Sequence, residues 1–194
     1  MTGLLGGAFD PPHLGHLALA DTARTRFELD RLVVVVTGSP PHKAVETAAE
    51  LRYRLAEAAF AGRDWAEVSR WELDRHGPSY TVETARWAEK EYGEAIFLVG
   101  ADEFASFLIW REPREILRHV RLGVATRRGF PPSALETVLR ELEQPARVEP
   151  FEMAEWPVSS TEIRELVARD EPIEGLVPPR VAELIAELGL YRSC

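Results

Sequence analysis

The sequence has little cysteine, a deficit of basic charge and no long apolar run. Its one cysteine is Cys194, so no disulfide can form within the chain, which favours a reducing, cytoplasmic location. The densest apolar run, Leu32 to Val36, is far shorter than the roughly 20 residues that span a bilayer, and the first ten residues do not resemble a signal peptide. Lys and Arg number 23 against 32 Asp and Glu, and the net charge of −9 argues against general nucleic-acid binding. We therefore expect a soluble cytoplasmic protein that binds neither membranes nor nucleic acid, with no pattern that specifies an oligomer.

The composition is that of a folded domain. Hydrophobic residues make up 45% and charged residues 28% of 194 residues, enough to bury a core. We expect one domain over residues 1–194, in which the helices from about residue 159 form a small C-terminal part.

Short apolar runs alternate with longer segments of helical period. This alternation predicts an α/β fold with a doubly wound, mostly parallel sheet of the Rossmann-like type. In such sheets ligands bind beyond the carboxyl ends of the strands, here near Gly6, Gly38 and Gly100. The predicted strands are Leu4–Leu5, Leu32–Val36, Ala95–Val99, Val120–Ala125 and Arg147–Pro150, and the predicted helices are Leu14–Phe27, Ala48–Ala61, Thr81–Tyr92, Pro132–Leu142, Ser159–Ala168 and Pro179–Leu188.

The segment from Gly6 to His16 reads Gly-Gly-Ala-Phe-Asp-Pro-Pro-His-Leu-Gly-His and joins a strand to a helix. Glycines allow close approach of a phosphate to the backbone, and the first turn of a helix offers N–H groups and a positive dipole end. His13 and His16 are spaced to share one face of that turn, and Gly15 places no side chain between them. Two imidazoles there could donate hydrogen bonds to a reacting phosphate, or one could cap the turn while the other packs. Zinc binding is the other use of paired histidines, but no third ligand follows at a suitable spacing, so we expect no protein metal site.

This segment resembles the GG-x-F-D-P-x-H-x-G-H signature of the nucleotidylyltransferase superfamily, whose members transfer a nucleotide monophosphate from ATP or CTP to a phosphate group. The HxGH element is also similar to the HIGH element of class I aminoacyl-tRNA synthetases, but this chain is too short and lacks their KMSKS-type loop. The resemblance implies that His13 and His16 are catalytic and that the remaining ATP-binding positions of this segment are Gly6, Gly7, Phe9 and Gly15.

A second motif, Val158-Ser-Ser-Thr-Glu-Ile-Arg164, begins a predicted helix. Its hydroxyls fit an ordinary N-cap, and Arg164 adds a planar cation that suits phosphate oxygens. The motif resembles the superfamily's I-S-S-T-x-I-R element, with Val158 in place of Ile. The resemblance implies that Ser159, Thr161 and Arg164 hold the outer phosphates of ATP.

Three further segments are similar to bacterial nicotinate mononucleotide adenylyltransferases, and the similarity runs from Gly6 to Arg192. The first is Ser39-Pro-Pro-His42-Lys43, which in that family faces the mononucleotide phosphate, although a rigid surface loop with a solvated lysine would read the same. The second is Gly77-Pro-Ser-Tyr-Thr81, whose last residue in the family offers a backbone N–H to the pyridine carboxylate.

The third segment runs from Gly100 to Pro113. Asp102 is placed to hydrogen-bond a ribose hydroxyl or to cap a helix, and with Gly100 it resembles the family's G-x-D element on the ATP side. Trp110 is a packing residue or a stacking surface. The resemblance implies that Trp110 stacks on the pyridine ring and that the N–H of Arg111, where the family has an aromatic residue, binds its carboxylate.

These resemblances imply transfer of AMP from ATP to nicotinate mononucleotide, giving deamido-NAD and pyrophosphate in NAD biosynthesis, with Mg²⁺ carried by ATP. Backbone donors suit a carboxylate, which only accepts hydrogen bonds, so the acid is favoured over the amide. Two alternatives stay open. One is another small-molecule nucleotidylyltransferase, with nicotinamide mononucleotide or phosphopantetheine as acceptor, and the other is a non-catalytic nucleotide sensor.

Overall fold

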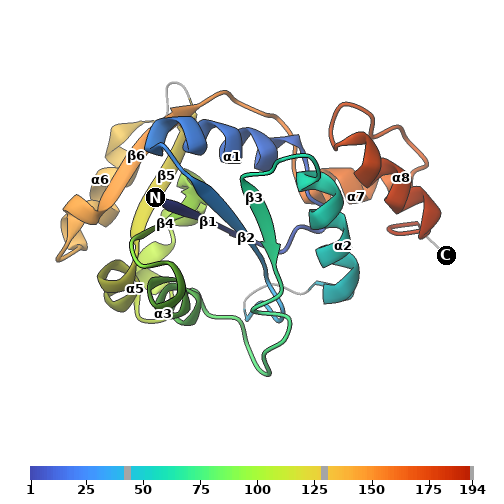
Figure 1. Ribbon diagram of the computed structural model, residues 1–194. Coiled ribbons are helices and arrows are strands. Elements are labelled where there is room, and N and C mark those ends of the chain that lie inside the picture. Colours follow the sequence, from blue (N-terminus) through green and yellow to red (C-terminus); the bar gives the residue numbers. More distant parts are fainter. Residues whose placement is uncertain (42–44, 128–130, 193–194) are drawn as a thin grey trace.

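A computed structural model describes residues 1–41, 45–127 and 131–192 of the chain (Figure 1). Its centre is one sheet in which six strands, all parallel, follow the order β3-β2-β1-β4-β5-β6. The predicted α/β fold with a doubly wound parallel sheet is confirmed. The strands are β1 (Thr2–Gly7), β2 (Arg31–Val36), β3 (Ala66–Ser69), β4 (Ala95–Gly100), β5 (Arg121–Arg127) and β6 (Val148–Met153).

Helices cover both faces of the sheet. Buried residues of α1, α2, α7 and α8 pack in one apolar cluster, and those of α3, α4, α5 and α6 pack in a second cluster on the opposite face. Helices α7 and α8 stand together at the C-terminal end of the chain (Figure 1). The helices are α1 (Leu14–Phe27), α2 (Ala49–Phe60), α3 (Thr81–Tyr92), α4 (Ala101–Phe104), α5 (Pro113–His119), α6 (Pro132–Glu141), α7 (Ser160–Ala168) and α8 (Pro179–Glu187), and short 3₁₀ turns occur at Phe107–Ile109 and Pro145–Arg147.

Strand β2 shows why the apolar run predicted the sheet. Its four valines are fully buried, and their side chains alternate between the faces, so that Val34 and Val36 join one cluster while Val33 and Val35 join the other. From Leu32 to Val36 the strand is buried on both faces and contains no polar residue, which is the pattern of a central strand in a parallel sheet.

One strand and two α-helices were not predicted. Strand β3 lies at the sheet edge and none of its residues is buried, so its sequence carries no continuous apolar signal. Helix α4 has only four residues, which is too short for periodicity. Helix α5 begins with Pro113, an ordinary first residue of a helix that could have indicated it.

The chain order reverses at β1, which pairs with β2 on one side and with β4 on the other. A crevice opens at such a switch point, beyond the carboxyl ends of the two central strands. Gly7 and Gly100 are the last residues of β1 and β4, so the crevice lies where the glycine turns predicted it.

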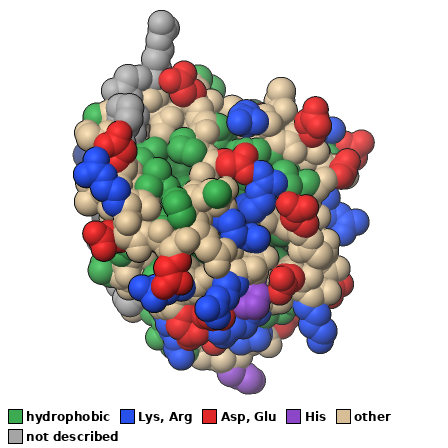
Figure 2. Space-filling model, turned by 90° about the vertical axis from the view of Figure 1, so that its left-hand side faces the viewer, with side chains coloured by type: hydrophobic (Ala, Val, Ile, Leu, Met, Phe, Trp, Pro, Cys, Tyr) green, Lys and Arg blue, Asp and Glu red, His purple; other side chains and the backbone are tan. Residues whose placement is uncertain are grey.

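The face of the molecule in Figure 2 carries mixed charge. On the side of the molecule that Figure 2 shows, acidic and basic side chains are interspersed and do not gather into a basic surface. Among the described residues, no helix is long and apolar enough to cross a membrane.

Candidate active site

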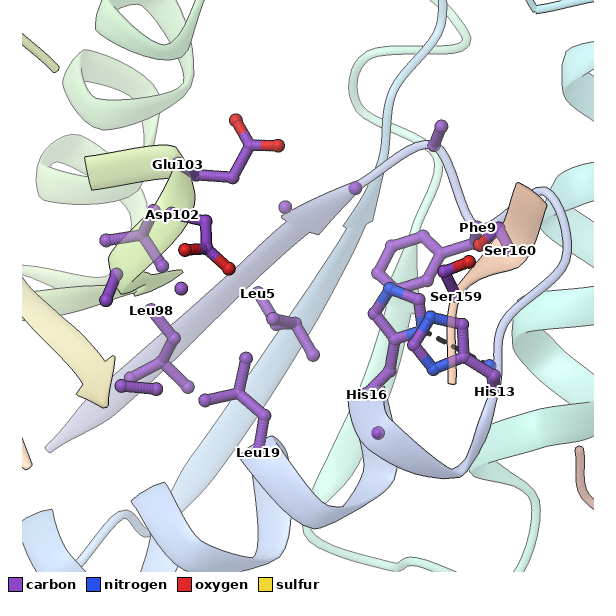
Figure 3. Close-up of a pocket in the computed structure, with 18 of the residues that line it drawn as sticks. Leu5, Phe9, His13, His16, Leu19, Leu98, Asp102, Glu103, Ser159 and Ser160 are labelled. Atoms are coloured by element: carbon purple, nitrogen blue, oxygen red, sulfur yellow. Dashed lines mark hydrogen bonds between the residues drawn. The ribbon is translucent and has the colours of Figure 1, made fainter. Parts of the chain in front are cut away.

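A cleft of about 910 Å³ opens at the carboxyl ends of β1, β4 and β5 and is closed on one side by the segment between β6 and α7. Most of the predicted site residues line it: Gly6, Gly7, Phe9, His13, Gly15, His16, Thr81, Gly100, Asp102, Trp110 and Ser159. In Figure 3 the two histidines lie beside Phe9 and Ser159, with Asp102 and Glu103 apart from them, beyond Leu5. Thr161, Arg164 and Arg111 are not among the lining residues, and His42 and Lys43 lie outside the residues that the structure describes.

The two histidines form a pair at the start of α1. His13 is the N-cap residue, with extended backbone, and His16 is three residues further on. The backbone N–H of His13 donates to Nδ1 of His16 at 3.2 Å, and the ring centroids are 3.8 Å apart. Because Nδ1 of His16 is an acceptor, the proton of the neutral imidazole is on Nε2. His16 therefore has a defined donor nitrogen at the positive end of a helix dipole.

His13 is partly buried. Burial lowers its pKa from 6.5 to about 4, so its ring is neutral at pH 7. Its Nδ1 is buried and has no hydrogen-bond partner among the described residues. A Cβ at Gly15 would lie 3.0 Å from this nitrogen, so the missing side chain at Gly15 makes room for the ring of His13. A role of Gly15 toward a nucleotide stays a prediction.

Aromatic packing accounts for the two glycines at the end of β1. A Cβ at Gly6 would lie 2.8 Å from Cζ of Phe97, and one at Gly7 would lie 3.1 Å from Cζ of Phe9. Phe9 itself has a left-handed backbone (φ 51°) and is 1% exposed, and its ring lies 5.0 Å from that of His16. The side chain of Phe9 thus supports the histidine from beneath.

Helix α7 is joined to the loop that carries His13. Ser160 Oγ donates to the carbonyl oxygen of Pro11 at 2.8 Å, and Arg164 Nη1 donates to that of Asp10 at 2.8 Å. Arg164 also contacts Thr161 Oγ1 at 3.3 Å, and Ser159 accepts from the N–H of Glu162 as an N-cap. Arg164 therefore contacts the histidine loop through the backbone of that loop and is not among the residues that line the cleft, so a contact with the phosphates of ATP stays a prediction. The sequence did not single out Ser160 as a contact residue.

A buried arginine beneath the site was missed by the sequence analysis. Arg52 is 1% exposed, and its guanidinium donates to the carbonyl oxygens of Ala8 and Thr37 at 2.8 and 2.7 Å, and to that of Gly38 at 3.2 Å. Burial lowers its pKa. The guanidinium of Arg52 thus joins the loops after β1 and β2. In the sequence, only the position of Arg52 on the buried side of the predicted helix could have indicated this role.

The opposite end of the cleft brings two predicted segments together. The guanidinium of Arg111 lies 4.3 Å above the ring of Tyr80, which precedes Thr81, the first residue of α3. Trp110 Nε1 donates to Ser106 Oγ at 3.1 Å, which fixes the plane of the indole ring. The Arg111 side chain is about half exposed (52%), and it also lies 3.5 Å from Glu112.

Glu72 lines the same end and was not predicted. Its Oε1 accepts from Thr84 Oγ1 at 2.5 Å, while Oε2 is buried without a hydrogen-bond partner among the described residues. Burial raises the pKa of this carboxyl group. Within the same ranges, no group of three or more His, Cys, Asp or Glu side chains is arranged to hold a metal ion.

A parallel sheet that reverses its strand order beside a glycine turn and a helix N-terminus is a feature of nucleotide-binding α/β proteins. The chain belongs to the cytidylyltransferase-like family, whose sequence profile matches residues 4–166. This result confirms the predicted superfamily.

Relatives extend over nearly the whole chain. It is 41% identical to a probable nicotinate-nucleotide adenylyltransferase of Moorella thermoacetica (98% of this chain, 91% of the relative) and 41% identical to one of Thermus thermophilus (98% of both). Among solved structures, the nicotinic acid mononucleotide adenylyltransferase of Plasmodium falciparum complexed with NaAD has a TM-score of 0.77 at 16% identity (98% and 96% covered). A putative nicotinate-nucleotide adenylyltransferase of Vibrio parahaemolyticus has a TM-score of 0.70 at 20% identity (100% and 96% covered). The structural matches support the fold.

Proposed function

We propose that this chain transfers AMP from ATP to nicotinate mononucleotide, giving deamido-NAD and pyrophosphate in NAD biosynthesis. One observation carries the proposal: a single cleft is lined at one end by the pair His13 and His16 and at the other by Trp110 and Thr81. The names of relatives 41% identical over nearly the full length support the same reaction.

The reaction needs little acid–base chemistry from the protein. An oxygen of the mononucleotide phosphate, already anionic at neutral pH, attacks the α-phosphorus of ATP, and the bond from that phosphorus to the bridging oxygen breaks to release pyrophosphate. Catalysis then consists of positioning and stabilisation of charge. His16 is assigned the donation of its Nε2 proton to a phosphate oxygen, and the neutral ring of His13 assists it.

The ATP end of the cleft has the features of a phosphate and ribose site. Ser159 and the N-terminal turn of α1 offer hydroxyl and N–H donors to the phosphates. Asp102, after the end of β4, is assigned to a ribose hydroxyl. Thr161 and Arg164 reach the outer phosphates only if the guanidinium turns from its contact with Asp10. The remaining assigned ATP-binding positions are Gly6, Gly7, Phe9, Gly15 and Gly100.

The mononucleotide end favours the acid. Trp110 offers a ring face to the pyridine, and Thr81, as the first residue of α3, has an N–H that no intrahelical acceptor reaches. That N–H and the one of Arg111 are assigned to the nicotinate carboxylate. A carboxamide would turn its NH₂ toward one of these donors and leave it unpaired. His42 and Lys43 are proposed for the mononucleotide phosphate.

Mg²⁺ is proposed to arrive with ATP, bound mainly by phosphate oxygens and water, since the described residues offer no protein cage. It would neutralise charge on the departing pyrophosphate. We also propose that residues 1–194 form one domain, because the buried residues Val181 and Ile185 of α8 belong to the same apolar cluster as Leu17 of α1.

The test is a pyrophosphate-release assay on the purified chain with ATP and Mg²⁺. We expect release with nicotinate mononucleotide and a lower kcat/KM with nicotinamide mononucleotide. Equal values for the two would contradict the carboxylate pocket, and release with phosphopantetheine alone would assign a different acceptor. ATP binding without release from any acceptor would indicate a nucleotide sensor.

A further inference from the structure

The C-terminal tail reaches back to the loop between β1 and His13. After α8, Gly189 and Tyr191 have left-handed backbones (φ 61° and 64°), and the chain turns so that the Tyr191 hydroxyl donates to Asp10 Oδ1 at 2.7 Å. The two residues are 181 positions apart, and Asp10 is only 6% exposed. Tyr191 lies outside residues 4–166, the part of the chain that the family profile matches.

Asp10 is central to the loop that carries the histidine pair. Other elements hold this loop through its backbone: Arg52 of α2 binds the carbonyl of Ala8, and Arg164 of α7 binds the carbonyl of Asp10 itself. Tyr191 differs, because it holds the loop through a side chain, the Asp10 carboxyl group. The loop is therefore fixed from three directions by groups that come from α2, α7 and the C-terminal tail.

The hydroxyl of Tyr191 is suited to this contact. Burial, with its hydrogen bond to Asp10, raises the pKa of the phenol, so it remains a donor at all physiological pH values. Without the hydroxyl, a nearly buried carboxyl oxygen would lose its partner, and such a group costs free energy until it moves to find another. The loop would have to move with it, and the backbone N–H of His13, which orients His16, is three residues away.

We propose that Tyr191 is a positioning residue, whose hydroxyl holds Asp10 and thereby sets the loop that places His13 and His16. The expected change in kcat rests on the proposed function, whereas the expected displacement of the histidine rings rests on the contacts alone. Displacements of about 1 Å in a positioned group lower turnover by up to about 10²-fold. We expect a smaller effect here, about tenfold in kcat, because Arg52, Ser160 and Arg164 still hold the loop.

The first experiment compares Tyr191→Phe with Tyr53→Phe. Tyr53 is the matched control, because its hydroxyl contacts the carbonyl of Val68 at 3.3 Å, away from the cleft. In Tyr191→Phe, kcat for pyrophosphate release should fall about tenfold while KM for nicotinate mononucleotide stays within about twofold, because Thr81 and Trp110 are untouched. Tyr53→Phe should keep both constants. Equal kinetics for the two variants, or a Tyr191→Phe protein that does not fold, would overturn the proposal.

The second experiment is a double-mutant cycle with Asp10→Asn. If Tyr191 acts through Asp10, Tyr191→Phe in the Asp10→Asn background should lower kcat no further than the more damaging single change. Multiplication of the two losses would contradict this route.

A third readout separates this inference from the proposed function. The NMR signals of the His13 and His16 rings should shift in Tyr191→Phe and not in Tyr53→Phe, whether or not the chain makes deamido-NAD. Unchanged ring signals in Tyr191→Phe would refute the positioning role. A wild-type protein that releases no pyrophosphate would refute the function alone.

Discussion

The backbone N–H of His13 donates to Nδ1 of His16 at 3.2 Å, so the main chain at the start of α1 orients the imidazole that follows it. A backbone donor cannot rotate away as a side chain can, which leaves the Nε2 proton of His16 with one direction. The ring of Phe9, 5.0 Å from that of His16, supports the same orientation from below.

Replacement of His16 by alanine should lower kcat about 10²-fold or more, by analogy with the loss of one donor that stabilises developing charge. The fold should survive, because His16 lies on the cleft side of α1. The measurement is kcat for pyrophosphate release, with circular dichroism to verify folding. Turnover near that of the wild type in a folded His16→Ala protein would remove the assigned role.

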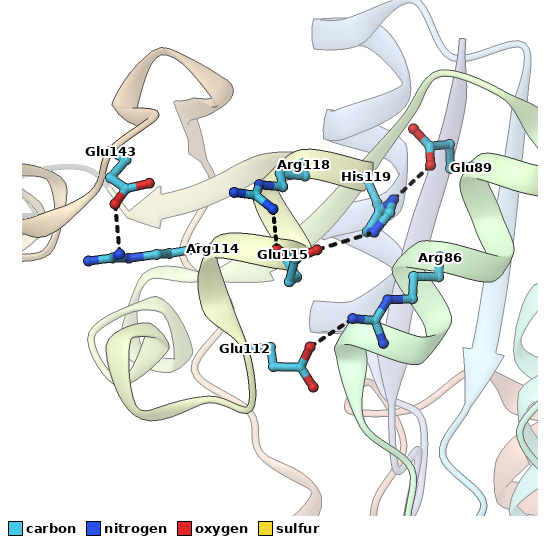
Figure 4. A network of polar contacts seen from close by, with 8 residues as sticks. All are labelled: Arg86, Glu89, Glu112, Arg114, Glu115, Arg118, His119 and Glu143. Carbon is cyan, nitrogen blue, oxygen red and sulfur yellow. Dashed lines mark hydrogen bonds and ion pairs between the residues drawn. The ribbon is translucent and has the colours of Figure 1, made fainter.

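His119 offers a matched control for that change. It lies on α5, where Nδ1 contacts Glu89 Oε2 at 2.7 Å in the surface ion-pair network of α3 and α5 (Figure 4). Surface ion pairs contribute about 1 kcal/mol or less. His119→Ala should therefore keep kcat and KM within about twofold.

The pKa of His13 predicts how stability depends on pH. The folded protein keeps this ring neutral down to about pH 4, whereas the unfolded chain takes up a proton below about pH 6.5. Between these values the unfolded state binds more protons, so the free energy of unfolding falls as pH falls, by about 2 kcal/mol from this group between pH 7 and pH 5. The measurement is the free energy of unfolding in guanidinium at pH 7 and at pH 5. The difference between the two pH values should be smaller in His13→Asn than in the wild type by about 2 kcal/mol. A His13 ring that titrates near pH 6.5 by NMR would contradict the prediction.

The sequence predicted the fold well where the signals for an element lie within that element. The bounds of Leu14–Phe27 and Thr81–Tyr92 were predicted to the residue, because helical period and the glycine or loop signals at their ends agree. Strand β3 has the opposite character: its place at the sheet edge depends on pairing with β2, from Leu32 to Val35, which no local pattern encodes.

The site was predictable only to the level of motifs. The histidine pair and the Ser159 cap follow from spacing in the chain. The contacts of Ser160 with Pro11 and of Arg52 with Ala8 join residues 149 and 44 positions apart, and an arginine or serine on a helix gives no sign of its partner. Arg164 shows what a motif cannot predict. A guanidinium suits phosphate oxygens, but in the structure that of Arg164 donates to the backbone carbonyl of Asp10.

Arg52 should be among the most stabilising polar residues. Arg52→Met would leave the carbonyls of Ala8, Thr37 and Gly38 without a donor in a buried site, at a cost of about 3 to 5 kcal/mol. Arg63→Met is the control, since Arg63 makes a partly exposed ion pair with Asp21 at 3.0 Å and should cost less than about 1 kcal/mol. Chemical denaturation measures both, and similar losses in the two variants would disprove a structural role special to Arg52.

Replacing either of two glycines of the cleft by alanine should change a different kinetic constant. At Gly100 a Cβ meets nothing within 4 Å and the backbone is extended (φ −72°), so Gly100→Ala should keep or slightly raise stability. It should raise KM for ATP about tenfold if the nucleotide crosses this turn.

At Gly15 an added Cβ would lie 3.0 Å from Nδ1 of His13, so Gly15→Ala should displace that ring and lower kcat, with a smaller change in KM. Steady-state kinetics of both variants distinguish a clash with ATP from a displaced histidine. The added Cβ at Gly100 has free space around it until ATP binds, so it affects KM for ATP, whereas a displaced His13 ring is misplaced in the free and the bound enzyme and affects kcat. An unchanged KM for ATP in Gly100→Ala would place the nucleotide elsewhere in the cleft, and an unchanged kcat in Gly15→Ala would show that the position of His13 does not limit turnover.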